Sequence, residues 1–212
     1  MTDASAGEVP RPAHAESSRA AAMVDRGRRA QPSGWWGMVL FLCSEATLFG
    51  TIIGSYFYLN FGARRWPPPP IKAPEVAGPL IATAVLVATV PLMAAAAAAA
   101  RRGRRWSTVR WIAVAMVIQA AYLAAQVLLI RHDLRQFSPQ GSAYGSIYFT
   151  LLFAHHAHVL LGLLLNGVVL WKVTRHGLTN YWLIGVRGLA LYWYVVAGLA
   201  LVVVFTVLSP SL

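Results

Sequence analysis

The stretch that most constrains this chain is an apolar run from Trp35 to Phe61, which is long enough to cross a bilayer and carries one carboxylate, Glu45, near its middle. A helix rises 1.5 Å per residue, so Glu45 lies on the order of 15 Å inside the membrane. An ionised carboxylate is costly at that depth, so Glu45 is expected to face a bundle interior and to have a partner there. The partner could belong to a functional site, or it could be a polar group on a neighbouring helix that simply forms a hydrogen bond with Glu45.

Composition places the whole chain in the membrane. It has 212 residues, of which 58% are hydrophobic and 12% charged, which is too apolar for a soluble domain of this size. The formal net charge is +11, but most basic residues flank apolar runs. We therefore interpret them as membrane anchors and expect no nucleic acid as a partner. The one cysteine, Cys43, excludes an intramolecular disulfide.

The hydropathy pattern predicts an all-α, polytopic membrane helical bundle. Residues 1–33 are rich in Ala, Arg, Ser and Pro and are expected to form a disordered cytoplasmic tail, followed by a membrane domain over residues 34–212. The four prolines after Trp66 predict an extended loop outside the membrane, and Pro91 is expected to kink the second span. The five expected spans are residues 35–61, 76–100, 109–130, 144–172 and 183–208.

Basic residues indicate the orientation of these spans. The short segment from Arg101 to Arg110 contains five arginines, and the tail is also basic, so we expect the N-terminus inside and the C-terminus outside. Such a cluster is also typical of an anionic-lipid headgroup site, although topology control alone would explain it. The candidate headgroup ligands are Arg101, Arg102, Arg104, Arg105 and Arg187, the last of which is expected to snorkel to the interface.

Small and polar residues indicate which helix faces meet. Ala46, Gly50 and Gly54 recur at four-residue spacing in the first span, so we expect a neighbouring helix to pack there, on the side of Glu45. In the third span, a second set shares one face and is expected to point into the bundle. This set is Gln119, Tyr122 and Gln126.

The fourth span contains three histidines and an asparagine. His155, His158 and Asn166 form a polar stripe, and His156 points partly away from it. Metal centres in membrane bundles take ligands from several helices, and no other span contains a histidine, so we expect no metal site in this chain. His158 lies about as deep as Glu45, so the two side chains can meet and share a proton, which would reduce the cost of burying either.

At this point a family resemblance becomes specific. The segments WWGMVLFLCSEATLFG, WPPPP, GSAYGSIYFTLLFAHHAHVLLG and ALYWYVV, in this order, resemble subunit III of haem–copper cytochrome c oxidases in its five-helix bacterial form. The resemblance implies a non-catalytic subunit of a bacterial cell membrane, without a redox cofactor of its own. It also implies contact with subunit I and with subunit II, which hold haem and copper, and support of proton uptake and oxidase turnover. Bound phospholipid is implied as well.

The resemblance also assigns roles to single residues. Glu45 matches the family's membrane-buried glutamate, and His155 and His158 match two histidines of its F-H-G-L-H segment. Gln126 and the pair Tyr192–Trp193 match family positions too.

Four positions depart from the family pattern. Leu129 and Arg187 stand where the family usually has glutamates, and Tyr194 and Ala197 stand where it has a histidine and an aspartate. These departures suggest a divergent branch, and an accessory subunit of nitric oxide reductase is one alternative. A stand-alone carrier of small solutes or protons, using Glu45 and the histidines, is an alternative from another class. One acidic residue among all expected spans speaks against such a carrier.

Overall fold

The computed structural model describes residues 33–72 and 74–211, so the expected disordered tail lies outside the described residues except for Ser33. Within the described ranges the secondary structure is helical, without strands. Five helical segments are long and apolar enough to span a membrane: Gly34–Gly62, Ala77–Arg101, Arg105–Gln136, Ala143–His176 and Trp182–Leu208. The prediction of an all-helical fold with five spans is therefore confirmed.

Helices α2, α5, α6 and α7 are longer than the apolar runs that predicted them. Helix α6 begins after Ser142, whose hydroxyl accepts a hydrogen bond from the Gly145 amide at 3.0 Å, and it ends before Gly177, at a φ of 77°. These are the usual signals for starting and stopping a helix, and they lie outside the apolar core of the span. The elements are α2 (Ser33–Gly62), α3 (Ala77–Val87), α4 (Val90–Arg101), α5 (Arg105–Gln136), α6 (Ala143–His176), α7 (Asn180–Leu208) and the 3₁₀ turn η1 (Ser209–Ser211).

The second span consists of two helices, α3 and α4, because Pro91 interrupts it. Proline has no amide hydrogen and its ring clashes with the carbonyl four residues earlier, here that of Val87. Helix α3 accordingly ends at Val87, and α4 begins at Val90. The Leu86 carbonyl next to this break accepts hydrogen bonds from both the amide and the hydroxyl of Thr89, at 3.0 and 2.7 Å.

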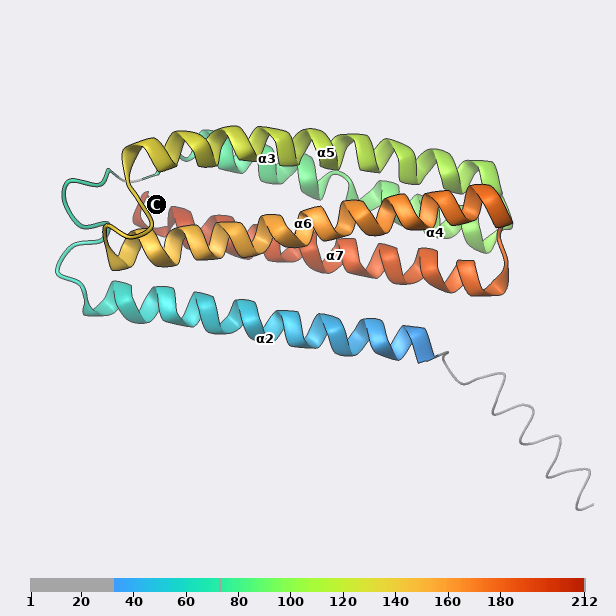
Figure 1. Cartoon of the computed structure of the whole chain (residues 1–212), viewed down its shortest axis with the longest axis horizontal. Helices are drawn as coiled ribbons and strands as arrows, with labels where there is room; N and C mark the ends of the chain where they lie inside the picture. Colours follow the sequence, from blue (N-terminus) through green and yellow to red (C-terminus); the bar gives the residue numbers. More distant parts are fainter. Residues whose placement is uncertain (1–32, 73, 212) are drawn as a thin grey trace, which may run out of the picture.

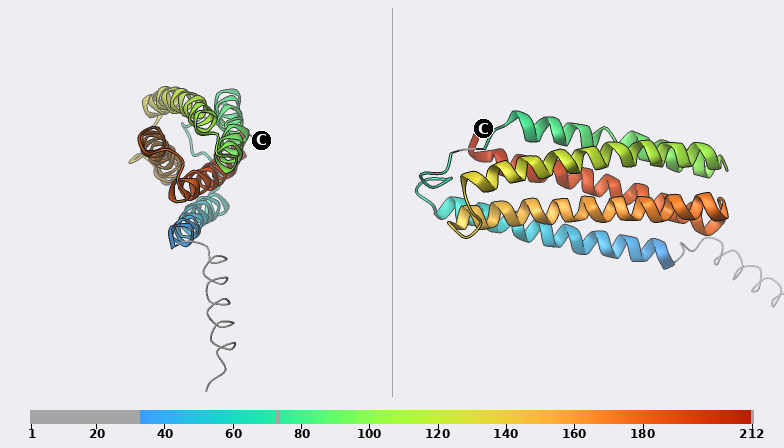
Figure 2. Two further views of the ribbon diagram at one scale, coloured as in Figure 1. Left: turned by 90° about the vertical axis from the view of Figure 1, so that its right-hand side faces the viewer. Right: turned by 45° about the horizontal axis from the view of Figure 1, so that its top comes forward.

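Helices α5, α6, α7 and the pair α3–α4 close into a bundle, and α2 lies outside it (Figures 1 and 2). Helix α2 packs against α6 and α7, whereas α7 also contacts α3 and α4. The turn between α4 and α5 and the connection between α6 and α7 lie at one end, which we call the arginine end. The loops over residues 63–72, 74–76 and 137–142, together with η1, lie at the other end, which we call the loop end.

Large side chains, rather than small ones, form the buried face of α2. Leu42, Phe49 and Tyr56 recur every seven residues and are 7%, 0% and 0% exposed. This spacing keeps one stripe of a helix against its neighbours, and Glu45 lies on the same stripe. The expected packing on Ala46, Gly50 and Gly54 is wrong for this chain, because all three are exposed and no atom lies near the two glycine positions. Glu45 and Ala46 are adjacent in sequence but point to different sides.

Candidate functional site

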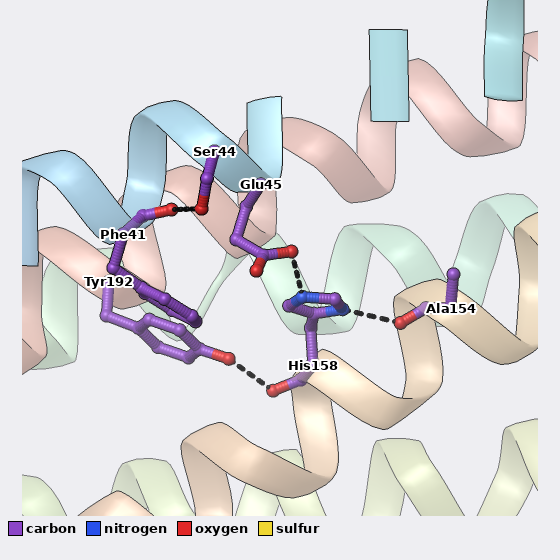
Figure 3. Close-up of polar contacts among 6 residues, drawn as sticks. All are labelled: Phe41, Ser44, Glu45, Ala154, His158 and Tyr192. Atoms are coloured by element: carbon purple, nitrogen blue, oxygen red, sulfur yellow. Dashed lines mark hydrogen bonds and ion pairs between the residues drawn. The ribbon is translucent and has the colours of Figure 1, made fainter. Parts of the chain in front are cut away.

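The structure brings Glu45 and His158 together at the contact between α2 and α6. Glu45 Oε2 is within hydrogen-bond distance of His158 Nε2, and the two side chains are 16% and 15% exposed (Figure 3). The sequence placed both residues at similar depth but left their contact open. Each side chain therefore supplies the partner that the other needs in an apolar environment.

The second ring nitrogen of His158 determines how this pair holds its proton. His158 Nδ1 lies 2.6 Å from the Ala154 carbonyl oxygen, which can only accept, so Nδ1 carries a hydrogen (Figure 3). A neutral His158 then has an unprotonated Nε2, and Glu45 must donate to it. If the proton moves across, an imidazolium donates to a carboxylate instead. The pair thus shares one proton, and either position leaves the contact hydrogen-bonded.

Aromatic side chains from α2 and α7 contact His158. The Phe49 ring lies edge-on to His158 with centroids 5.3 Å apart. The Tyr192 hydroxyl donates to the His158 carbonyl at 2.7 Å, which joins α7 to the same turn of α6 (Figure 3). Gly162 permits this close approach, because a Cβ there would lie 2.9 Å from the Tyr192 ring and 2.6 Å from that of Trp193.

His155 and His156 contact Tyr122 of α5, and the His155 ring also lies edge-on to Phe49 of α2 with centroids 6.5 Å apart. His155 is 2% exposed and its Nε2 lies 3.4 Å from the Tyr122 hydroxyl, which also receives a 3.4 Å contact from Gln126 Nε2. Both contacts are long for hydrogen bonds. His156 donates through Nδ1 to the Leu152 carbonyl at 2.6 Å and stacks on the Tyr122 ring, with centroids 5.9 Å apart. Tyr122 and Gln126 therefore do point inward, as their spacing predicts.

A continuous series of buried hydrogen bonds crosses the bundle. The Trp193 indole donates to Asn166 at 3.0 Å, and the Asn166 amide donates to Gln119 at 2.7 Å. Gln119 donates in turn to the Thr89 hydroxyl at 3.1 Å, and that hydroxyl donates to the Leu86 carbonyl. Every donor in the series has its own acceptor, and the series links α7, α6, α5 and the break between α3 and α4.

The candidate headgroup arginines have different surroundings at the arginine end. Arg101, Arg102 and Arg104 are exposed. Arg105 instead donates to the Thr174 carbonyl, which fastens the start of α5 to α6. The Arg187 guanidinium lies over the Trp35 ring at 5.5 Å, which joins α7 to α2. Three of the five candidates thus remain available to a ligand outside the bundle.

The α6 histidines do not belong to a cluster of metal-ligand side chains within the described residues. Among residues 33–72 and 74–211, no three His, Cys, Asp or Glu side chains group as metal ligands would. Nδ1 of both His156 and His158 is committed to a carbonyl of its own helix, and Nε2 of His158 faces Glu45. The two Nδ1 bonds leave Nε2 as the atom that could coordinate a metal, because a ligating histidine commonly donates its other ring N–H to a carbonyl, and Nε2 of His158 already contacts Glu45.

The departures from the family pattern lie in unlike environments. Ala197 is 3% exposed, so the aspartate that the family has there would be buried in this bundle. Tyr194 is 39% exposed, and Leu129 is partly buried beside Gly78. Arg187, at which the resemblance implies a glutamate, lies with its guanidinium over the Trp35 ring.

Sequence reasoning did not identify Thr89 or Trp193 as partners of Gln119 and Asn166. Thr89 could have been predicted, because it is two residues before Pro91. A proline inside a span leaves backbone groups without their helical hydrogen bonds, and nearby polar side chains commonly bond those groups. Trp193 gave no such signal. Only the register between α6 and α7 shows that its indole meets Asn166.

Comparison with known proteins agrees with this architecture. The sequence matches the family described as cytochrome c oxidase subunit III over residues 21–209. It is 25% identical to cytochrome c oxidase subunit 3 of Thermostichus vulcanus, over 91% of this chain and 94% of that one. It is 27% identical to cytochrome bo(3) ubiquinol oxidase subunit 3 of Pseudomonas aeruginosa, over 76% of both chains.

Some relatives are longer. Cytochrome c oxidase subunit 3 of Neurospora crassa is 26% identical over 76% of this chain, and the match spans 61% of the fungal protein.

Proposed function

Because this chain belongs to the cytochrome c oxidase subunit III family, we propose that it is a non-catalytic subunit of a respiratory haem–copper oxidase in a bacterial cell membrane. The observation that carries this function is the extent of the family match, which covers all five spans. Subunit I would be the main contact and subunit II a further one. The complex would pass electrons to oxygen while moving protons, and the named relatives include both cytochrome c and ubiquinol oxidases.

Purification with the natural partners tests this function. The tagged chain is extracted in a mild detergent and its optical spectrum is recorded. We expect haem absorption from co-purified subunits, and oxygen consumption with either reduced cytochrome c or a quinol, which would identify the electron donor. A colourless, monodisperse chain would contradict the proposal and would favour a stand-alone carrier.

Haem and copper would lie in the partner subunits and not in this chain. The support is that the described residues contain no group of three possible metal ligands and that the whole sequence has one cysteine. Metal analysis of the isolated subunit after washing with a chelator tests this. Stoichiometric iron or copper that survives the wash would contradict it.

The Glu45–His158 pair would hold α2 to the bundle and keep a shared proton near the centre of the membrane. The contact between Glu45 Oε2 and His158 Nε2 supports a structural role, and its compatibility with the proton on either side chain supports a contribution to proton uptake during turnover. A direct part in electron transfer has no support from these side chains. Initial rate and inactivation during turnover, measured for Glu45→Gln, separate the two roles, because only a proton-delivering residue would abolish the initial rate in an intact complex.

Phospholipid would bind at the arginine end. Arg101, Arg102 and Arg104 are exposed there, and the sequence has no acidic residue between Glu75 and Asp133 to neutralise them. Native mass spectrometry with added anionic or zwitterionic lipid tests this proposal. Replacing the three arginines with glutamine should reduce retention of anionic lipid and leave zwitterionic lipid unchanged; equal retention by both proteins would contradict the proposal.

The arginine end would face the cytoplasm. Ser107 lies at this end, near the start of α5, and Gln140 lies in the loop after α5 at the opposite end. In a background without Cys43, cysteines at these positions can be labelled in intact cells with an impermeant reagent. Labelling at position 140 alone is expected from the positive-inside distribution, and the reverse pattern would invert the topology.

A further inference from the structure

An apolar groove runs between α3 and α5, on the side of the bundle away from α2 (Figures 1 and 2). Its volume is about 520 Å³, and its walls include Ile81 and Val85 of α3 and Ala125 and Leu128 of α5. Ile81 and Leu128 are each 65% exposed, and Val85 is 40% exposed. The described chain therefore leaves this groove open toward the surrounding membrane.

A polar cavity of about 460 Å³ adjoins the groove at the loop end, where α5 ends and α3 begins. Leu129 lines both spaces, and Gly78 of the groove is the sequence neighbour of Pro79 of the cavity. Charged side chains of both signs line the cavity: Lys72, Glu75 and Asp133. The two spaces together form a site that is polar at the helix ends and apolar along the helices.

The charged groups of the cavity are held near one another. Tyr148, which is 3% exposed, donates to Asp133 Oδ2 at 2.7 Å and so fixes that carboxylate. Glu75 and His132 both act electrostatically on Asp133, so they lie close to it. In the part of the chain that the structure describes, no ion pair joins Lys72 to either carboxylate. One cation and two carboxylates therefore line the same space without pairing with one another.

The length of the groove indicates what fills it. Its walls extend from Gly78 to Val85 on α3 and from Leu129 back to Ala121 on α5. At 1.5 Å per helical residue, the groove reaches about 12 Å from the polar cavity. One leaflet of the hydrocarbon core is about 15 Å thick, and a transmembrane helix of a partner would need contact over about 30 Å. The groove therefore fits an acyl chain of one leaflet, with the polar cavity at the depth of its headgroup.

We propose that phosphatidylethanolamine binds at this site, with its ammonium against Asp133 and Glu75, its phosphate against Lys72 and one acyl chain between α3 and α5. Two carboxylates against one lysine disfavour an anionic headgroup. A primary ammonium donates three hydrogen bonds to such carboxylates, whereas the methylated ammonium of choline donates none. Leu129, at which the resemblance implies a glutamate, keeps the entrance to the groove apolar. The site does not depend on the proposed oxidase function, because all its side chains belong to this chain.

Filling the groove tests the acyl-chain position. Ala124 and Ala125 are adjacent and both exposed on α5, but only Ala125 lines the groove. The full chain is purified with the partners it carries and mixed with equal amounts of phosphatidylethanolamine, phosphatidylcholine and phosphatidylglycerol of the same acyl chains. Native mass spectrometry should show that Ala125→Phe retains about fivefold less phosphatidylethanolamine than Ala124→Phe, which should match the unchanged protein. Equal retention by the two variants would overturn the proposal.

Changes in the polar cavity test the headgroup. Glu75→Gln should lower the retained ratio of phosphatidylethanolamine to phosphatidylcholine about fivefold, whereas Lys72→Gln should weaken both lipids alike. Arg64→Gln is the control, because Arg64 is exposed on the same loop and lines neither space. If the unchanged protein retained the choline or glycerol lipid equally well or better, the headgroup assignment would be wrong. A cryo-EM map of the complex should show an elongated density in the groove, and a partner's helix there would overturn the proposal.

Discussion

The bundle of α3–α7 and the outer helix α2 are held in different ways. In the bundle, a directional series of buried hydrogen bonds runs from Trp193 through Asn166 and Gln119 to Thr89. Helix α2 instead packs mainly against α6 and α7, and is joined to them by Glu45–His158 near its middle and by Trp35 under Arg187 near its start. In an apolar medium, a series of hydrogen bonds in which every donor has an acceptor favours a single arrangement of the helices that it links. Isolated contacts, in contrast, can be lost one at a time. Helix α2 is therefore expected to detach from the bundle more easily than the other helices do.

The largest loss is expected from Asn166→Leu. Asn166 accepts from Trp193 and donates to Gln119, so its removal leaves two buried groups without partners. The cost should be about 2–4 kcal/mol, measured as reduced thermal stability of the purified subunit or complex. Leu164→Ala on the same helix is the control, because Leu164 is 60% exposed. Equal effects of the two changes would show that the series does not stabilise the bundle.

Gly162→Ala should separate α6 from α7. The new Cβ would lie 2.6 Å from the Trp193 ring, which is too close for any real contact, and the overpacking should cost about 1–3 kcal/mol. The control is Gly167→Ala on the same helix, where nothing lies within 4 Å of the added atom. That change should be neutral or stabilise by about 0.5–1 kcal/mol, because alanine favours helix. A neutral Gly162→Ala would mean that the contact with α7 is looser than the structure has it.

Glu45→Ala tests the main attachment of α2. It leaves the His158 Nε2 unpaired and opens a void, so we expect a loss of about 1–2 kcal/mol and weaker retention of the subunit in its complex. Glu45→Gln should lose less, because the glutamine amide can donate to the same nitrogen while Nδ1 stays bonded to Ala154. If both variants were equally impaired, a hydrogen bond would not explain the role of Glu45.

The smallest effect is expected from Arg187→Gln. The guanidinium lies 5.5 Å from the centre of the Trp35 ring, and such contacts contribute about 0.5–1 kcal/mol at accessible sites. Amide hydrogen exchange should rise in the first turns of α2 and stay unchanged in α4 and α5. Arg101→Gln provides a control at an exposed position of the same end. Faster amide exchange throughout the bundle would contradict the expectation that α2 can detach without disturbing the other helices.

The amino-acid sequence alone determined the number of spans, the depth of Glu45 and the inward face of Gln119, Tyr122 and Gln126. These properties depend on hydropathy and on helical spacing, which are local. Glu45 and His158 could also be placed at similar depth, because depth follows from counting residues along each span.

Only the tertiary structure decided which side chains meet. The sequence pointed to Ala46, Gly50 and Gly54 as the packed face of α2, but the heptad stripe of Leu42 and Phe49 is buried instead. Partners such as Trp193 for Asn166, or Tyr144 for Trp66, likewise depend on how far each helix is rotated and shifted against its neighbours. Rotation and register are set by the packing of large side chains from several helices at once, so no single span contains that information.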